Sequence, residues 1–435
     1  MTPQNKDVTS SVKTTPLVKR IASVRLPDDA SEIQVNKMAK LWKLDLAPKR
    51  ADVVDTFVDG EFNLVMTVFK PPFVVDTSVL SKMETFDYAT GWSGLPEEWT
   101  ETNVASWLNA VVSDLGKATG QVAQRSWNSE YCSKILSGSP IQRKPDIVLL
   151  DVNHESPVSW RNIRAITEVT RSKTEVDRMV DTINDKTFIM FTTQFNRRFV
   201  PMISIFDKRF RLTVTDRQGQ LRSVIYNLSG PHPNHALHLI HLLATLCFGR
   251  PEDIGYDPSI ITNSRDETTA IICDNVKYKV LHCIYAVQGL VGRATHVFLV
   301  ESNKQQFVLK DSWIEESRPY SEMRHLTRIQ GVDGVPVLQH GWDVRMTDRP
   351  MISNSETMKP NSETTKPELL TTWLICQGNY GIYNRRRVRR RVVSPSIGVP
   401  ISHFRTVREL ISAFRDITKS AYVHYFKASQ LTSIT

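Results

Sequence analysis

The stretch LVGRATHVFLVESNKQQFVLKDSW, at residues 290–313, decides the fold of the second half of this chain. Two β-rich apolar runs, HVFLV and FVL, flank a polar segment that is typical of a turn. Gly292 precedes the first run, and Lys310 follows the second. A glycine lets the backbone approach a phosphate group closely, and a strand lysine can pair with that phosphate. The stretch therefore predicts a strand pair that can face a phosphorylated ligand, although a lone glycine more often marks a plain turn.

The loop before the first strand partly matches the glycine-rich loop that covers ATP phosphates in protein kinases, G-x-G-x-x-G-x-V. Aligned on Val297, the three glycine positions fall on Leu290, Gly292 and Thr295, so only the central glycine remains. Arg293 adds a cation next to that glycine. The loop therefore predicts a reduced phosphate cradle.

Further kinase-like elements follow in order. Lys310 matches the strand lysine that pairs with the α- and β-phosphates, and Glu322, in a predicted helix, is the candidate for its ion-pair partner. Residues 335–344 (VPVLQHGWDV) are the next predicted strand. An exposed Lys–Glu pair is usually an ordinary surface contact, so the order of the elements carries more weight than any one of them.

The chain resembles the fungal-type protein kinase family, a divergent group of protein kinases. The likeness covers roughly residues 130–430, and its last part matches the hinge and the helix before the catalytic loop. The phrases that carry it are KPDIVLL (144–150), TTQFNRRFV (192–200), LCFGRPEDIGYDPSI (246–260), LVGRATHVFLV (290–300), VLKDSW (308–313), GVPVLQHGW (334–342) and GVPISHFRTVRELISAFRDITKSAYVHYFKAS (398–429).

The resemblance implies transfer of phosphate from ATP, with Mg²⁺, to Ser or Thr of a protein. It places the adenine beside a strand and hinge at residues 391–398. It assigns the nucleotide site to a phosphate loop, an ATP lysine and the helix partner of that lysine. The residues concerned are Gly292, Arg293, Thr295, Val297, Lys310 and Glu322.

The end of the sequence departs from the family pattern. A phrase of the form GILHRDIS..N is expected after residues 427–429, but the sequence reads QLTSIT and ends at Thr435. The base aspartate, the metal-binding Asn and Asp, and the large lobe are therefore missing. We expect a pseudokinase with no catalytic residue. It is either a truncated product or a short form that acts by binding a nucleotide, a protein or nucleic acid.

The predicted fold class is α/β in two modules, after a loose tail at residues 1–30. An α/β domain spans 31–270, and a kinase-like small lobe of antiparallel sheet plus helix spans 271–435, with an exposed low-complexity insertion at 347–368. The apolar stripe of the last helix would face water. The predicted strands lie at 146–152, 165–170, 199–206, 210–215, 223–228 and 277–287, and the predicted helices at 104–115, 177–195, 234–247 and 406–429.

Two acidic residues in the first module offer an alternative function. Asp146, preceded by proline, and Glu168 match the pattern PD…(D/E)xK of nuclease-like folds, in which two strand carboxylates hold Mg²⁺ and a lysine stabilises developing charge. Thr170 occupies the lysine position, so Arg171 or Lys173 would have to replace it. We expect a decayed nuclease-like remnant. The simpler interpretation is that Asp146 hydrogen-bonds a turn and Glu168 forms a structural salt bridge.

The composition limits compartment and partners only broadly. The 435 residues carry 55 basic and 46 acidic side chains, and this formal charge of +9 favours acidic partners without selecting one. The five cysteines form no CxxC pair, which indicates reduced thiols, an intracellular location in cytoplasm or nucleus, and no zinc-ribbon site. The sequence contains no apolar run of about 18 residues, so it predicts no membrane span.

Three polar patterns have plain structural explanations beside functional ones. Histidines recur every three residues, and a polar helix face is favoured over a metal site. The run RRRVRRR at 385–391 predicts a solvated basic strand edge rather than a nuclear-import or nucleic-acid patch. Several arginines between 196 and 222 predict a basic sheet face that could meet nucleic acid or offset nearby acids. The histidines are His232, His235, His238 and His241.

Overall fold

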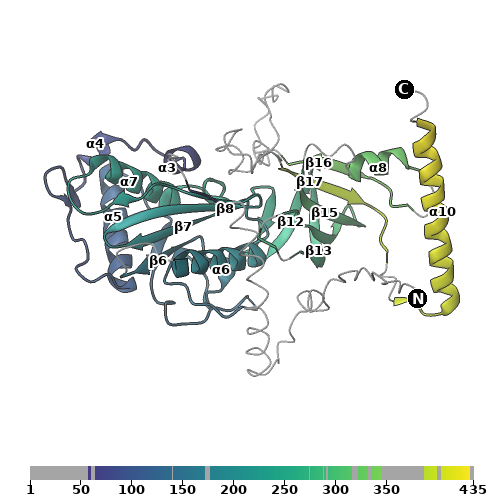
Figure 1. The fold of residues 1–435 in the computed structure, drawn as a ribbon, viewed down its shortest axis with the longest axis horizontal. Helices are drawn as coiled ribbons and strands as arrows, with labels where there is room; N and C mark the ends of the chain where they lie inside the picture. The colour runs from purple at the N-terminus through teal and green to yellow at the C-terminus, as the bar shows by residue number, and fades with distance from the viewer. Residues whose placement is uncertain are drawn as a thin grey trace, which may run out of the picture.

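The computed structural model forms two β-sheet units that lie side by side (Figure 1). It describes residues 57–59, 64–139, 141–171, 177–273, 275–287, 289–290, 292–315, 322–331, 335–344, 387–398 and 403–431. The expected tail at 1–30 and the insertion at 347–368 lie outside these residues. A mixed α/β architecture is therefore confirmed for the described parts of the chain.

The first unit is built on an eight-stranded sheet. The strand order is β1-β9-β8-β7-β6-β5-β4, and β10 pairs with β8. Among the strands that the structure describes in this sheet, β6–β7 and β1–β9 are the parallel pairs. The strands are β1 (Phe57–Asp59), β4 (Arg125–Asn128), β5 (Ile147–Asp151), β6 (Ala165–Thr170), β7 (Phe199–Phe206), β8 (Arg209–Asp216), β9 (Gln220–Arg222) and β10 (Tyr226–Asn227).

Helices cover both faces of this sheet. On one face, α3 (Leu64–Val68), α4 (Thr77–Leu80), α5 (Glu101–Thr119) and α7 (Pro233–Phe248) enclose the larger apolar core. On the other face, α6 (Asp177–Thr193) encloses a smaller core with β5, β6 and β7. Alternate strand residues supply the two cores, since successive strand side chains point to opposite faces. A small hairpin, β2 (Phe86–Asp87) and β3 (Gly91–Trp92), packs at the edge of the larger core.

Most of the elements expected from periodicity are present. The apolar runs at 165–170 and 199–206 coincide with β6 and β7, and the helical patterns coincide with α5, α6, α7 and α10 (Val407–Leu431) to within a few residues. The strand expected at 223–228 is present only in part, as Tyr226–Asn227. The chain instead pairs at β9, leaves the sheet, and returns for the two residues of β10.

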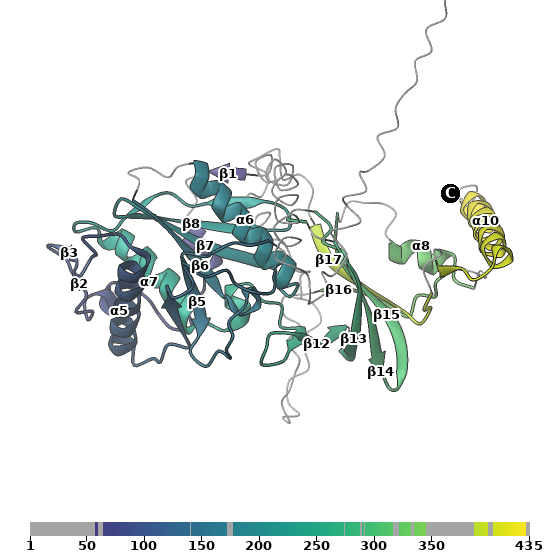
Figure 2. The ribbon, with the colours of Figure 1, turned by 90° about the horizontal axis from the view of Figure 1, so that it is seen from below.

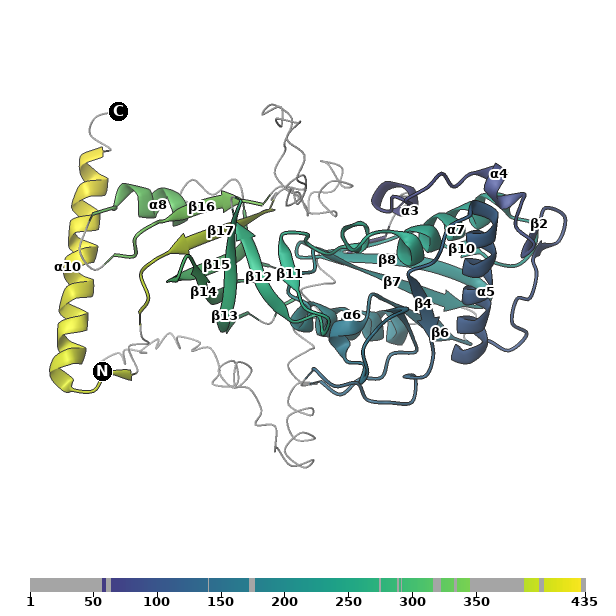
Figure 3. The ribbon, with the colours of Figure 1, turned by 180° about the vertical axis from the view of Figure 1, so that it is seen from behind.

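The second unit is an antiparallel sheet of seven strands in the order β11-β12-β13-β14-β15-β17-β16. The expected boundary at 270/271 falls inside β12, and the pairing of the second sheet begins at Ile260. Seen from behind, β11 and β12 lie between the first unit and the remaining strands (Figure 3). The strands are β11 (Ile260–Thr262), β12 (Thr268–Cys273), β13 (Val276–Ala286), β14 (His296–Ser302), β15 (Gln305–Glu315), β16 (His340–Asp343) and β17 (Arg387–Ser394).

The two faces of the second sheet have different neighbours. Lys310 of β15 lies in register with Val297 and Val392, so these three residues share one face. The next residue, Asp311, faces the opposite way and lies in register with His296 and Arg391. Figure 2 shows α8 (Glu322–Arg328) and α10 on the side of the sheet that is turned away from the first unit. The Asp311 face is therefore the one buried against the first unit.

A buried ionic cluster joins that face to the first unit. Arg389 and Arg391 of β17 are 1% and 0% exposed. Asp257, just after the first unit, accepts from both guanidinium groups at 2.7 Å, and Asp311 accepts from them at 2.9 and 2.7 Å. Burial alone would raise the pKa of Asp257, but Arg391 and Arg389 outweigh it and hold this pKa well below its usual value. Arg391 also donates to the Ser259 hydroxyl at 2.7 Å.

The prediction of a solvated basic edge at 385–391 is therefore wrong for Arg389 and Arg391. Val388 and Val392 are buried in β17, as a strand requires, but Arg389 and Arg391 are buried as well. The physical reason is that the face of β17 that carries Arg389 and Arg391 packs against the first unit. Two buried aspartates neutralise the arginines there. Residues 385 and 386 lie outside the described residues.

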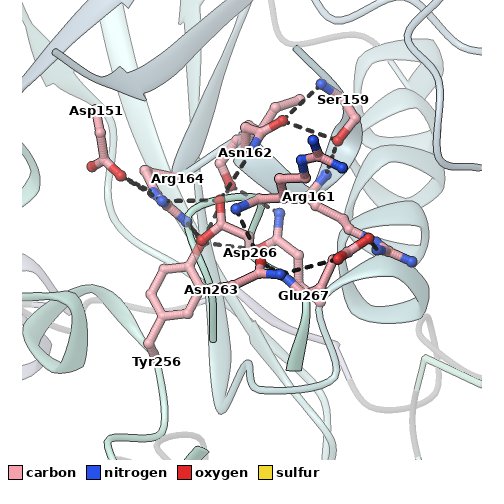
Figure 4. Close-up of polar contacts among 12 residues, drawn as sticks. Asp151, Ser159, Arg161, Asn162, Arg164, Tyr256, Asn263, Asp266 and Glu267 are labelled. Carbon is pink, nitrogen blue, oxygen red and sulfur yellow. Dashed lines mark hydrogen bonds and ion pairs between the residues drawn. The ribbon is translucent and has the colours of Figure 1, made fainter. Parts of the chain in front are cut away.

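A second polar contact holds the β11–β12 hairpin to the first unit (Figure 4). Asp266 at the hairpin tip accepts from Asn162 at 3.1 Å and pairs with Arg164 at 3.0 Å. Arg164 also pairs with Asp151 and donates to the Tyr256 hydroxyl at 3.0 Å. The two units therefore share several interlocking polar contacts.

The amphipathic helix α10 stands apart from the sheet in Figure 1. Its stripe is exposed at Val407, Ile411, Phe414 and Ile417, in agreement with the expectation that this face meets water. In the part of the chain that the structure describes, no helix is both long and apolar enough to cross a membrane.

We predict that Arg391→Met destabilises the whole chain. Removing one partner of a buried ionic cluster leaves uncompensated carboxylates, which costs about 3–5 kcal/mol of unfolding free energy. Urea denaturation measures this cost. Arg390→Met is the matched control, because Arg390 is the next residue on β17 and pairs with the half-exposed Asp343. Losing that pair should cost about 1 kcal/mol or less. Equal losses in the two variants would contradict the assigned role of the cluster.

Candidate nucleotide site

Lys310 and Glu322 form an ion pair on the outer face of the second sheet. The Lys310 Nζ lies 2.6 Å from Glu322 Oε2, and both side chains are partly exposed. The strand β15 presents Lys310, and α8 begins with Glu322, which is also the favourable end of a helix for an acid. The pairing that the sequence suggested is therefore present. Its role in nucleotide binding stays a prediction.

A cavity of about 310 Å³ adjoins this ion pair, between α8 and strands β15 and β17. Glu322 belongs to its wall, and so does the exposed Arg293 of the loop that precedes β14. The wall is rich in charge, and its cations can receive an anionic group. The other lining residues are Ser312, Ile314, Glu315, His325, Leu326, Arg387, Arg390 and Val392.

The loop between β13 and β14 contacts the first unit through Gly292 and the cavity through Arg293. Gly292 has φ +120°, a conformation that other residues adopt only with strain, so glycine is required here. The Gly292 N–H donates to the carbonyl oxygen of Arg217 at 2.8 Å, which commits it to the first unit. The next residue, Arg293, accepts from the Trp313 N–H at 2.8 Å and lines the cavity. Thr295, farther along, accepts from the Val287 N–H and closes the base of the loop.

The loop is fastened to the first unit by Leu290 and Arg217, neither of which the sequence suggested as an anchor. Leu290, at the first glycine position of the kinase pattern, is 3% exposed and belongs to the α6 core of the first unit. Arg217 donates to the carbonyl oxygens of Gly289 at 2.6 Å and Leu290 at 3.4 Å. Its guanidinium lies 4.0 Å from the Phe191 ring centre. The sequence signal for this attachment was an apolar residue at a position where the kinase pattern has glycine.

The described residues fit nucleotide phosphates better than they fit a metal ion. Lys310 and Arg293 are suitable cations for phosphate oxygens. Mg²⁺ needs oxygen ligands, commonly one or two carboxylates in addition to the phosphates. Glu322 is engaged by Lys310, and the described ranges contain no group of three or more His, Cys, Asp or Glu side chains suited to a metal.

Asp146 and Glu168 also meet, on the α6 face of the first sheet. Asp146 Oδ2 accepts from the Val169 N–H at 3.0 Å, and its Oδ1 lies 3.4 Å from Lys186 Nζ. The same ammonium forms a short contact with Glu168. The cation beside these two carboxylates therefore comes from α6. Arg171 is exposed, and Lys173 lies outside the described residues. Sequence spacing could not show the source of the cation, since Lys186 is sixteen positions beyond Thr170.

Burial dominates the electrostatics of Glu168. The side chain is 3% exposed, and desolvation raises its pKa to about 7, although Lys186 pulls in the opposite direction. The neighbouring Asp146 adds to the rise. Glu168 therefore takes up a proton near neutral pH, which an ordinary surface glutamate does not do.

The remaining polar patterns have structural roles. His241 hydrogen-bonds the Phe69 carbonyl oxygen at 2.9 Å, and His235 accepts from the Asn227 N–H at 3.0 Å, while His232 and His238 take part in ring contacts. The expected basic sheet face is wrong at Arg217, which is 2% exposed. Its position under the loop explains the burial.

We predict that Glu168 makes the stability of the chain fall as pH rises. The folded state binds more protons than the unfolded state between the ordinary glutamate pKa and about 7, so unfolding free energy decreases through that range. Relative to Glu168→Gln, the wild type should lose on the order of 2 kcal/mol between pH 5 and pH 8. Denaturant titrations at both pH values measure this, with the exposed Glu155→Gln as control. Parallel pH profiles for wild type and Glu168→Gln would refute the assignment.

Comparison with known proteins gives one match. The family model described as fungal protein kinase matches residues 144–431, which include α6, the buried ionic cluster, the Lys310–Glu322 pair and α10. Searches of curated proteins and of solved structures find no match. Because the matched range covers well over half of the sequence, the chain belongs to the fungal protein kinase family.

Proposed function

We propose that this chain binds a nucleoside triphosphate of the ATP type on the outer face of the second sheet. The observation that carries the proposal is the Lys310–Glu322 ion pair beside a cavity that Arg293 also lines. Val297 lies in register with Lys310 on the same face and offers an apolar surface near the strand lysine. Lys310 and Arg293 would hold phosphate oxygens by charge-assisted hydrogen bonds.

Protein phosphorylation is the activity that the family name implies. We propose that the 435 residues by themselves bind the nucleotide without turnover. Phosphoryl transfer depends on a positioned base and on metal-holding carboxylates and amides. The sequence contains neither an HRD nor a DFG tripeptide to supply them. The five cysteines of the sequence form no CxxC pair, which supports an intracellular location for this binding function.

We predict that Lys310→Ala weakens ATP binding by about tenfold or more, the loss expected for one charge-assisted hydrogen bond to phosphate. Isothermal titration calorimetry with ATP, with and without Mg²⁺, measures the affinity. Lys277→Ala is the matched control, because Lys277 is an exposed strand lysine on β13, which does not neighbour β15 in the sheet. Equal affinity of Lys310→Ala and wild type, or no binding by wild type, would reject the proposed site.

A second candidate function, metal-dependent cleavage of a phosphodiester, is favoured by one specific arrangement in the first unit. Ser204 of β7 lies in register with Glu168 of β6 and with Arg211 of β8, so a polar row crosses the α6 face of the sheet. The Ser204 hydroxyl is buried and has no hydrogen-bond partner among the described residues. Asp146 and Glu168 could supply two carboxylates to a divalent cation, provided that Lys186 withdraws from between them.

Incubation of the full chain with supercoiled plasmid and Mg²⁺ or Mn²⁺ tests this second candidate. Nicking that Asp146→Ala abolishes and the exposed Glu155→Ala retains would establish it. If the plasmid stays intact, Lys186 acts as a permanent neutralising partner, and the acidic pair is structural.

A further inference from the structure

The loop between β13 and β14 is attached to the first unit at three separate points. The Leu290 side chain enters the α6 core, Arg217 donates to the Gly289 and Leu290 carbonyl oxygens, and the Gly292 N–H donates back to the Arg217 carbonyl oxygen. Phosphate loops of the kinase pattern need glycine because the backbone itself approaches the ligand. Here one glycine position carries an apolar anchor and the remaining glycine has its N–H engaged.

Arg217 is well placed to act as the clamp of this attachment. It is 2% exposed, its guanidinium rests on Phe191 of α6, and it also donates to the Phe191 carbonyl oxygen at 3.2 Å. One side chain therefore ties α6 of the first unit to the loop of the second. A buried guanidinium needs acceptors on several sides, and the loop carbonyl oxygens supply part of that requirement.

The clamped segment leads directly to Arg293. The backbone of Arg293 is held from the other side by the Trp313 N–H at 2.8 Å, so the residue lies between two fixed points. Its exposed side chain lines the cavity beside Glu322. A cation held in this way loses less conformational entropy when it meets a phosphate, which favours binding.

We propose that Arg217 and Leu290 are positioning residues through which the first unit sets the nucleotide affinity of the second. The inference rests on the proposed nucleotide site and adds that this site is incomplete without the first unit. Arg217 does not touch the ligand. It acts through Arg293, whose placement depends on the clamp.

The experiment uses the full chain with Arg217→Met and Leu290→Gly, and ATP affinity is measured by calorimetry under conditions where circular dichroism shows every variant folded. Both variants should bind ATP about five- to tenfold more weakly, because the loop must be ordered on binding. Asp266→Asn is the matched control. It weakens the same junction at the Arg164 contact without touching the loop, so its affinity should stay within about twofold of wild type.

A double-mutant cycle separates positioning from general loosening. If Arg217 acts through Arg293, then Arg293→Ala should cost much less in the Arg217→Met background than in wild type. Additive losses, or tighter ATP binding by Arg217→Met, would overturn the inference. The second result would show that the clamp inhibits binding.

Amide hydrogen exchange supplies a readout that does not depend on ATP. Exchange at residues 289–290 and 292–295 should accelerate in Arg217→Met and stay unchanged in Asp266→Asn. Unchanged exchange in Arg217→Met overturns the clamp alone. Failure of the wild type to bind ATP overturns the proposed function and the affinity claim, while the exchange result still decides whether the clamp exists.

Discussion

The pairing of Arg389 and Arg391 with Asp257 and Asp311 is the constraint on which the rest of the structure depends. Four charged groups lie within the junction of the two units, and each guanidinium contacts both carboxylates. Such a cluster is tolerated only when every charge is neutralised and hydrogen-bonded. It therefore fixes the inner face of the second sheet against the first unit and leaves the outer face for ligands.

That division of faces explains where chemistry can occur. On β15, Asp311 and Trp313 serve the junction, whereas Ser312 lines the cavity and Lys310 pairs with Glu322 of the cavity wall. The same strand thus carries structure on one side and a candidate nucleotide site on the other. His296, buried in the junction, shows how strongly this side excludes water: burial first, and Arg217 second, lower its pKa to about 4.

Periodicity was sufficient for most of the elements, because β6, β7 and the long helices have strong apolar patterns that tertiary packing did not override. The Lys310–Glu322 pair could also be predicted, because both residues stand at the expected places in the order of kinase motifs along the sequence. The burial of Arg389 and Arg391 could not be predicted, because a run of arginines normally indicates a solvent-exposed segment. The partner aspartates lie more than 70 residues away in sequence. Lys186 and Arg217 were missed for the same reason: their contacts are long-range, and no local spacing encodes them.

The route of the chain through β11 and β12 has an evolutionary consequence. These strands belong to the second sheet, yet Asp257, which pairs with its arginines, and Ser259, which accepts from Arg391, come immediately before them. Asp266, at the tip of their hairpin, reaches back to Arg164. Recombination that joined the first half of one relative to the second half of another would separate several acidic residues from their basic partners at the same time. The two halves are therefore expected to diverge in concert, with compensating changes inherited as sets, and a lineage could not easily exchange one half for an unrelated domain.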